Sequence, residues 1–140
     1  MSFAETNPQT VSTTLTLALA GTEDTEIVIM KTKKLGTITD VWGMTDVAVA
    51  ADGDLAVAVY NRGTALAGTT VLATLNGAGT AWAATTPKVG TVANNTSITA
   101  DSYITAVVTR ASGSTATAHV LSVGVAFVPG SPAAVGSIDT

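Results

Sequence analysis

Alternation of apolar and polar side chains with a period of two is the feature that most constrains the fold of this 140-residue chain. Residues 11–20 alternate large aliphatic side chains with small or hydroxylated ones; the large ones are Val11, Leu15, Leu17 and Leu19. A strand points successive side chains to opposite faces of a sheet, so this segment predicts a half-buried strand with a threonine-rich outer face. The segments 103–110 and 116–128 carry the same signal.

Shorter strands are predicted between turn signals rich in Gly, Asn and Asp, at residues 25–31, 36–44, 55–60, 69–75 and 80–85. Turns are expected at 21–24, 61–63, 76–79 and 112–114, with Asn76-Gly77 as a hairpin signal. Residues 45–53 fit either a short helix or an extended connection, 87–95 read as a loop, and Ile98 begins a brief strand. Seven to nine short strands without a long amphipathic helix predict an all-β, antiparallel β-sandwich, jelly-roll-like, or a barrel.

The composition narrows the classes of protein. Charged residues make up 11% of the chain, the net charge is −4 and cysteine is absent. These values exclude a disordered chain, a disulfide scaffold and a basic nucleic-acid-binding surface. No apolar run is long enough for a transmembrane helix, and we expect a soluble chain without a secretory signal, made in a cytoplasm.

Low charge and few large apolar side chains predict a light core and a surface of Thr, Ser, Gly and Ala. Such a surface suits permanent contact with other protein, and association would supply the burial that the core lacks. The alternative is a sandwich that is stable alone and has a threonine-rich exterior.

Catalytic chemistry is not indicated. His119 is the only histidine and lies within a strand pattern, so a nucleophile–histidine pair has no support. Asp46 and Asp52-Gly53-Asp54 resemble part of a calcium loop but lack the closing glutamate, which favours a turn. The acids considered as a glycosidase pair are scattered or solvated, and they are Glu23, Asp24, Glu26, Asp40 and Asp101. We therefore expect no enzyme, no metal and no cofactor.

Two groups of residues are candidates for contact with a partner. The only basic cluster, Lys31, Lys33 and Lys34, with Arg62 and Arg110, either meets an acidic partner or protects a strand edge from aggregation. The second group, Trp42, Trp82 and Tyr103, either forms a platform that stacks on sugars or packs in a core or interface.

Two stretches of the sequence resemble a known group of proteins. They are GTITDVWGMTDVAVAADGDLAVAVYNRGTAL and ITADSYITAVVTRASGSTATAHVLSVGVAFVPG, and together they span residues 36–130. They resemble small jelly-roll domains of tailed bacteriophages, in which an I-x-x-V strand precedes a D-x-L-x-V-x-V strand, a later L/I-T-x-x-V strand and a long strand ending near Val-Pro. Asn61-Arg62-Gly63 and Asp101-Ser102 depart from the Asn-Gly and Gly-Asp of that pattern.

The resemblance implies a capsid decoration (cement) protein on the outer surface of a phage head. It implies a homotrimer that binds the major capsid protein at local three-fold positions, with neither nucleic acid nor membrane as a partner. A fibre or tail-associated module that binds a receptor or glycan is the alternative. Residues 1–11 are expected to form an N-terminal arm, 12–129 the sandwich and 130–140 a C-terminal tail. The expected partner-binding residues are Phe3, Lys31, Lys33, Lys34, Trp42, Trp82 and Arg110.

Overall fold

The computed structural model describes residues 10–19, 24–49, 55–76, 81–93, 97–110 and 119–130. All regular structure in these ranges is β-strand, and none of their residues belongs to a helix that could cross a membrane. The strands are β1 (Val11–Leu19), β2 (Asp24–Lys31), β3 (Gly36–Thr45), β4 (Leu55–Gly63), β5 (Thr70–Asn76), β6 (Lys88–Gly90), β7 (Tyr103–Arg110) and β8 (His119–Pro129).

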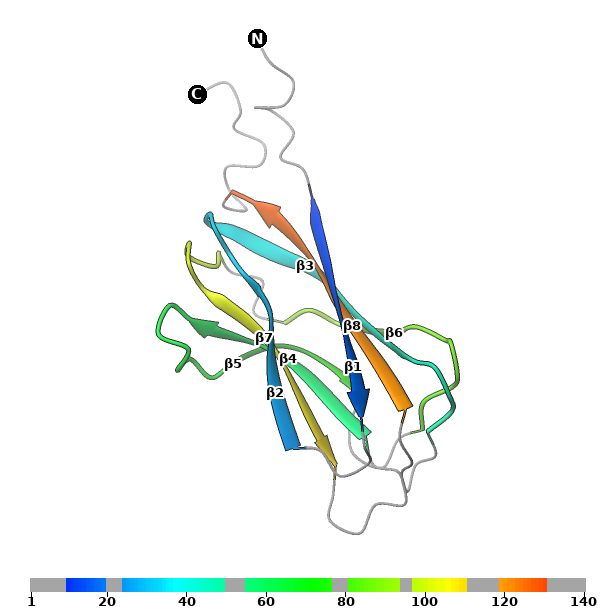
Figure 1. Cartoon of the computed structure of the whole chain (residues 1–140). Coiled ribbons are helices and arrows are strands. Elements are labelled where there is room, and N and C mark those ends of the chain that lie inside the picture. The colour runs from blue at the N-terminus through cyan, green and yellow to red at the C-terminus, as the bar shows by residue number, and fades with distance from the viewer. Residues whose placement is uncertain are drawn as a thin grey trace.

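The strands form two four-stranded sheets that face each other (Figure 1). The first sheet has the order β1-β8-β3-β6 and the second has the order β2-β7-β4-β5. Every neighbouring pair is antiparallel, and the chain crosses to the other sheet after each strand except β4. Eight strands wound in this way form a jelly roll, so the predicted fold class is confirmed.

The core lies between the sheets and follows the period-two pattern. In β7, Ile104, Ala106 and Val108 point inward and are fully buried, while their neighbours along the strand face the other side. The core is built from Val, Leu, Ile and Ala, and in the described residues Trp82 and Phe127 are its two buried aromatic side chains. Trp82 donates its indole N–H to the carbonyl oxygen of Leu55 at 3.0 Å, which satisfies the one polar atom that its burial would otherwise leave unpaired.

One predicted turn is wrong, and the strand before another ends one residue later than expected. Residues 61–63 belong to β4, because pairing with β7 continues as far as Gly63, and the turn follows at residues 64–66. Gly63 has a φ of 70°, and its N–H is held by the side-chain oxygen of Asn61 at 3.0 Å. Asn61, Arg62 and Gly63 therefore form an irregular end of β4, where the register against β7 shifts between Asn61 and Gly63. Asn76, expected in the hairpin turn, is the last residue of β5.

The strand predicted at residues 80–85 is reduced, where it is described, to isolated bridges of Trp82 with Val49 and of Ala84 with Thr45. The strand before it, β5, pairs with β4. The ambiguous segment 45–53 is not helical where it is described, up to residue 49, and it bends at residues 46 and 47. The predicted loop 87–95 contains β6, because Lys88–Gly90 gains its hydrogen bonds from β3 rather than from a local turn.

Candidate functional site

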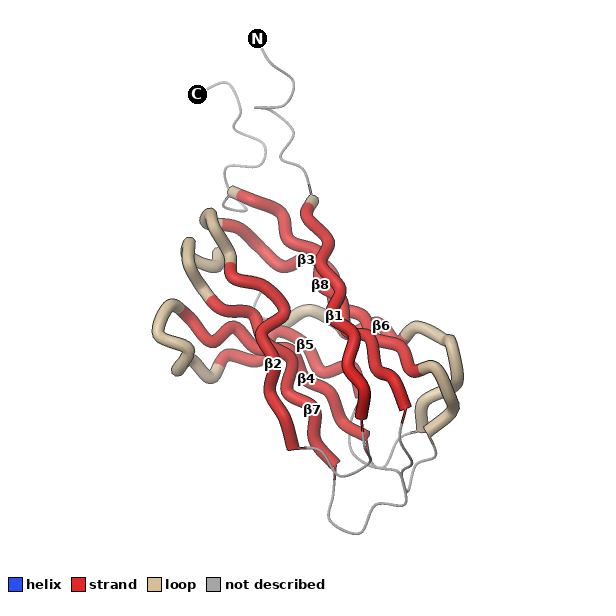
Figure 2. Tube along the Cα trace, viewed as in Figure 1, coloured by secondary structure: helices blue, strands red, loops and turns tan. Residues whose placement is uncertain are grey.

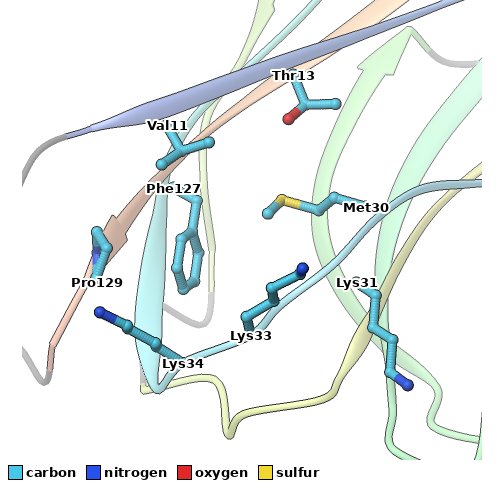
Figure 3. A pocket seen from close by; sticks show the side chains of 8 residues that line it. All are labelled: Val11, Thr13, Met30, Lys31, Lys33, Lys34, Phe127 and Pro129. Carbon is cyan, nitrogen blue, oxygen red and sulfur yellow. The ribbon is translucent and has the colours of Figure 1, made fainter.

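A pocket opens between the two sheets at one end of the sandwich, where β1 begins and β8 ends (Figure 3). Its volume is about 320 Å³. It is lined by β1, by the end of β2, by the connection to β3 and by the end of β8; the residues are Val11, Thr13, Met30, Lys31, Lys33, Lys34, Phe127 and Pro129. The pocket thus forms where the first and last strands of the sandwich, paired through Val11 and Phe127, meet the edge of the other sheet.

The pocket combines an apolar wall with a basic rim. Figure 3 shows Phe127 and Met30 facing the space, with Lys33 extending between them and Lys34 reaching toward Pro129. Lys31 points away from this space, and its ammonium lies 5.2 Å from the centre of the Tyr103 ring. All three lysines are exposed, and no carboxylate is among the described lining residues. This chemistry suits contact with an acidic surface that also presents apolar side chains.

The three lysines of the expected basic group therefore line one pocket, whereas Arg62 of that group pairs with Glu26 on the second sheet. The expected aromatic group is not brought together. Trp82 is only 1% exposed, so its position supports the core-packing interpretation and not a partner contact. Trp42 lies on the outer face of the first sheet and Tyr103 lies in the second sheet. The three rings therefore do not share a face.

Trp42 is half-buried against its own sheet. It lies opposite Gly124 on β8, and a Cβ atom placed on Gly124 would be 2.2 Å from the Trp42 ring. The indole therefore rests on the glycine backbone. On its other side Trp42 pairs with Val89, whose exposed fraction is 72%. The result is a weakly charged outer face with an aromatic ring at its centre.

Several expected residues lie outside the described part of the structure. Phe3, the arms at 1–9 and 131–140, and Asp52-Gly53-Asp54 fall there. The side chains of Arg110 and His119 are also outside it, although both residues belong to strands. Val11, expected as the last residue of the arm, is the first residue of β1.

Asp46, considered as a cation ligand, has a structural partner. Its side chain accepts a hydrogen bond from the backbone N–H of Val120 at 2.8 Å. Among the described residues, no three His, Asp or Glu side chains gather as they would around a metal ion.

A polar network on the second sheet was not predicted. Arg62 on β4 makes a two-pronged ion pair with Glu26 on β2, with contacts of 2.5 and 3.0 Å. Between them, Thr105 on β7 donates to Glu26 at 2.6 Å and is fully buried beneath the pair. The hydrogen bonds from Arg62 and then Thr105 lower the pKa of Glu26 below its usual value of 4.5. The sequence holds no signal for this network, because the three residues meet only through the sheet order β2-β7-β4.

Comparison with known proteins finds the same fold in a solved structure. No protein-family model and no curated protein matches the chain. Among solved structures, a chain of the cyanophage Pam1 capsid asymmetric unit aligns with a TM-score of 0.58 and 14% identity, over 89% of this chain and 87% of that one. The two proteins share their fold. A chain of infectious bursal disease virus, Gt strain, aligns with a TM-score of 0.43 and 12% identity, over 87% of this chain and 33% of that one.

Proposed function

We propose that this chain is a structural virion protein that decorates the outer surface of a phage head and stabilises contacts between major capsid subunits. The observation that supports this most strongly is the jelly-roll fold shared with a chain of the cyanophage Pam1 capsid asymmetric unit. The alignment covers nearly the same share of both chains, so the two have similar lengths. A small jelly roll without further domains is thus a known component of such a shell.

The surface chemistry fits adhesion to other protein. The outer face of the first sheet presents Thr14, Thr16, Met44 and Val89 around Trp42, with Asp40 as a charged neighbour on β3. Contact with a shell would therefore remove mainly apolar and hydroxyl-bearing surface from water. The basic rim of the pocket would orient the molecule toward an acidic patch on capsid subunits. Burial of this surface across a subunit boundary raises the free energy needed to separate the subunits. The three-fold assembly implied by the sequence resemblance belongs to this proposal.

The test is binding to purified, undecorated shells of the virus whose genome encodes the chain. Co-sedimentation measures the bound fraction, and electron cryomicroscopy of decorated shells locates the density. We expect jelly-roll density on the outer surface and shells that withstand a higher temperature when decorated. Failure to bind, or density only on a fibre or tail, would overturn the decoration role, and the latter outcome would favour the receptor-binding alternative.

Neutralising the pocket rim is expected to weaken this binding. The variant Lys31→Gln/Lys33→Gln/Lys34→Gln removes three positive charges from exposed positions, so we expect an affinity reduced by about tenfold or more, with a smaller dependence on salt. The matched control is Thr64→Glu/Thr69→Glu/Thr74→Glu, which changes the net charge equally at exposed positions on the β4–β5 side. Equal losses for the two variants would mean that net charge alone, and not the pocket rim, governs adhesion.

A further inference from the structure

Each sheet of the sandwich has two edge strands, and these differ in how they are protected. The edges are β1 and β6 in the first sheet, and β2 and β5 in the second. An edge strand exposes unpaired backbone N–H and C=O groups that can pair with another chain. Natural proteins block such edges with short strands, charged side chains, irregular register or covering loops.

Three of the four edges carry such protection. β6 has three residues and directly follows Pro87. β2 carries the charged residues Glu26 and Lys31 and shifts register after Val28. β5 shifts register twice against β4, and the loop after β6 covers part of its edge, because the N–H of Ala93 donates to the carbonyl oxygen of Leu72 at 2.7 Å.

The fourth edge, β1, has none of these protections in the part of the chain that the structure describes. Its nine residues, VSTTLTLAL, include no charged residue, no proline and no glycine. Its register with β8 is continuous from Val11 to Leu19, and within the described residues its backbone is paired on the β8 side alone. Val11, Ser12, Thr14 and Thr16 are exposed. Figure 2 shows β1 as one long uninterrupted strand, and the strand order places it at the border of its sheet.

We propose that β1 pairs with β1 of a second copy of this chain, antiparallel across a two-fold axis at Leu15. This register pairs all nine residues, with Val11 opposite Leu19 and Thr14 opposite Thr16. It also preserves the faces of the sheet, because odd-numbered residues meet odd-numbered residues and even-numbered residues meet even-numbered ones. The four-stranded sheet that contains β1 in one copy then joins the same sheet of the second copy, which gives one continuous eight-stranded sheet.

The strand itself argues for a second copy as the occupant. A partner of different sequence would be selected by complementary charges or shaped pockets, and β1 offers no charge. About Leu15, the large aliphatic residues Val11 and Leu19 and the threonines Thr14 and Thr16 are placed symmetrically, so this uncharged strand presents like residues to a second copy of itself. Opposed threonines on neighbouring antiparallel strands are a favourable cross-strand pair. The inference does not depend on the virion role, because it concerns isolated copies in solution.

Charge substitution on β1 tests the contact. In the proposed register, Thr14→Lys/Thr16→Lys places lysines opposite lysines at two positions, so we expect self-association weakened by about tenfold or more. Sedimentation velocity across a concentration series measures it. The matched control, Thr70→Lys/Thr74→Lys, adds the same charges at exposed positions on the edge strand β5 and should leave association unchanged. An equimolar mixture of Thr14→Lys/Thr16→Lys with Thr14→Glu/Thr16→Glu should restore pairing, exclusively between unlike chains.

Engineered cysteines provide a second reading that is independent of charge, since the natural sequence has no cysteine. A mixture of Thr14→Cys and Thr16→Cys chains, carrying different tags, should form a disulfide between unlike chains under mild oxidation. A wild-type chain that stays single at every concentration, association that survives lysine at positions 14 and 16, or a mixture without a disulfide would each overturn the proposal.

Discussion

The hydroxyl of Thr32 holds together two segments that are far apart in the sequence. Thr32 is fully buried, and its Oγ1 donates to the carbonyl of Thr99 at 2.9 Å and accepts from the N–H of Ser102 at 2.9 Å. The N–H of Thr32 donates to the carbonyl of Ser102, and its own carbonyl accepts from Asp101, which has a φ of 63°. The connection after β2 is thereby fixed to the segment that leads into β7, beside the lysines of the pocket.

Replacing Thr32 with valine should destabilise the protein by about 1–3 kcal/mol. Valine keeps the shape of threonine but leaves the buried N–H of Ser102 without this partner and removes the hydrogen bond to the carbonyl of Thr99. Urea unfolding followed by tryptophan fluorescence measures the change. Thr64→Val, at an exposed turn position, is the control and should stay within about 0.5 kcal/mol of wild type. A similar small effect at both positions would contradict the role assigned to Thr32.

Glu26 should give the stability a dependence on acid pH. Its pKa in the folded chain is lowered, chiefly by the hydrogen bond from Arg62, so the charged form favours folding. This contribution is complete above the unfolded pKa, near 4.5, and is lost as the pH falls through the lower folded value. The side chain is 38% exposed, so solvent limits the contribution to about 1 kcal/mol or less.

The measurement compares wild type with Glu26→Gln. The difference in unfolding free energy should be present near neutral pH, shrink well below pH 4.5 and decrease with added salt. A difference that stays constant across this range would mean that the ion pair with Arg62 contributes nothing measurable.

At the scale of the strands, the contact between β3 and β8 depends on one glycine. An alanine Cβ at position 124 would lie 2.2 Å from Cε2 of Trp42, and the same ring has two more atoms within 2.5 Å. Gly124→Ala should therefore displace the indole, cost about 1–3 kcal/mol and shift the Trp42 emission toward that of an exposed ring.

A double-mutant cycle isolates this effect. In a Trp42→Ala background, Gly124→Ala should cost much less, because the clashing ring is gone. An equal cost in both backgrounds would place the strain in the β8 backbone instead. Trp82 keeps its buried emission throughout, because it lies in the core and not beside Gly124.

How well an element could be predicted depended on its length and on where its hydrogen bonds go. The segments 11–20 and 103–110 alternate over eight residues or more, and their strands were predicted within one residue of the observed ends. The three residues of β6 contain too little alternation to signal a strand, and only β3 makes them one. Alternation also says which face a residue occupies and not which strand lies beside it, so it could not give the pairing of β5 with β4.

Part of the candidate site could be predicted from the sequence, and part of it could not. Lys31, Lys33 and Lys34 are close in the sequence, so their cluster was visible there. The apolar wall that they surround was not visible, because Phe127 reaches it only through the pairing of β1 with β8. For Trp82 the sequence left open a sugar platform or packing in a core or interface. Its burial depends on the bridge to Val49 and its satisfied indole N–H on the carbonyl of Leu55, and no local pattern encodes either contact.

At the scale of the whole molecule, the order of the strands predicts slow folding. The first strand pairs with the last, and neither four-stranded sheet is made from consecutive strands alone. Loops must close over long stretches of chain before these pairs form, so refolding should take on the order of milliseconds to seconds. Stopped-flow refolding monitored by Trp82 fluorescence measures the rate, and a phase of microseconds that recovers all the native signal would contradict this topology.

The same strand order also means that β1 is synthesised well before β8, the strand with which it pairs. A ribosome that has finished β1 must still translate the chain up to residue 129 before β8 is complete, which at about 5–20 residues per second takes roughly 5–20 seconds. Until β8 has been made, the backbone N–H and C=O groups of the uncharged β1 segment have no strand to pair with. Neighbouring ribosomes on one messenger RNA hold such segments close together, so encounters between sister chains begin before any of them has finished folding.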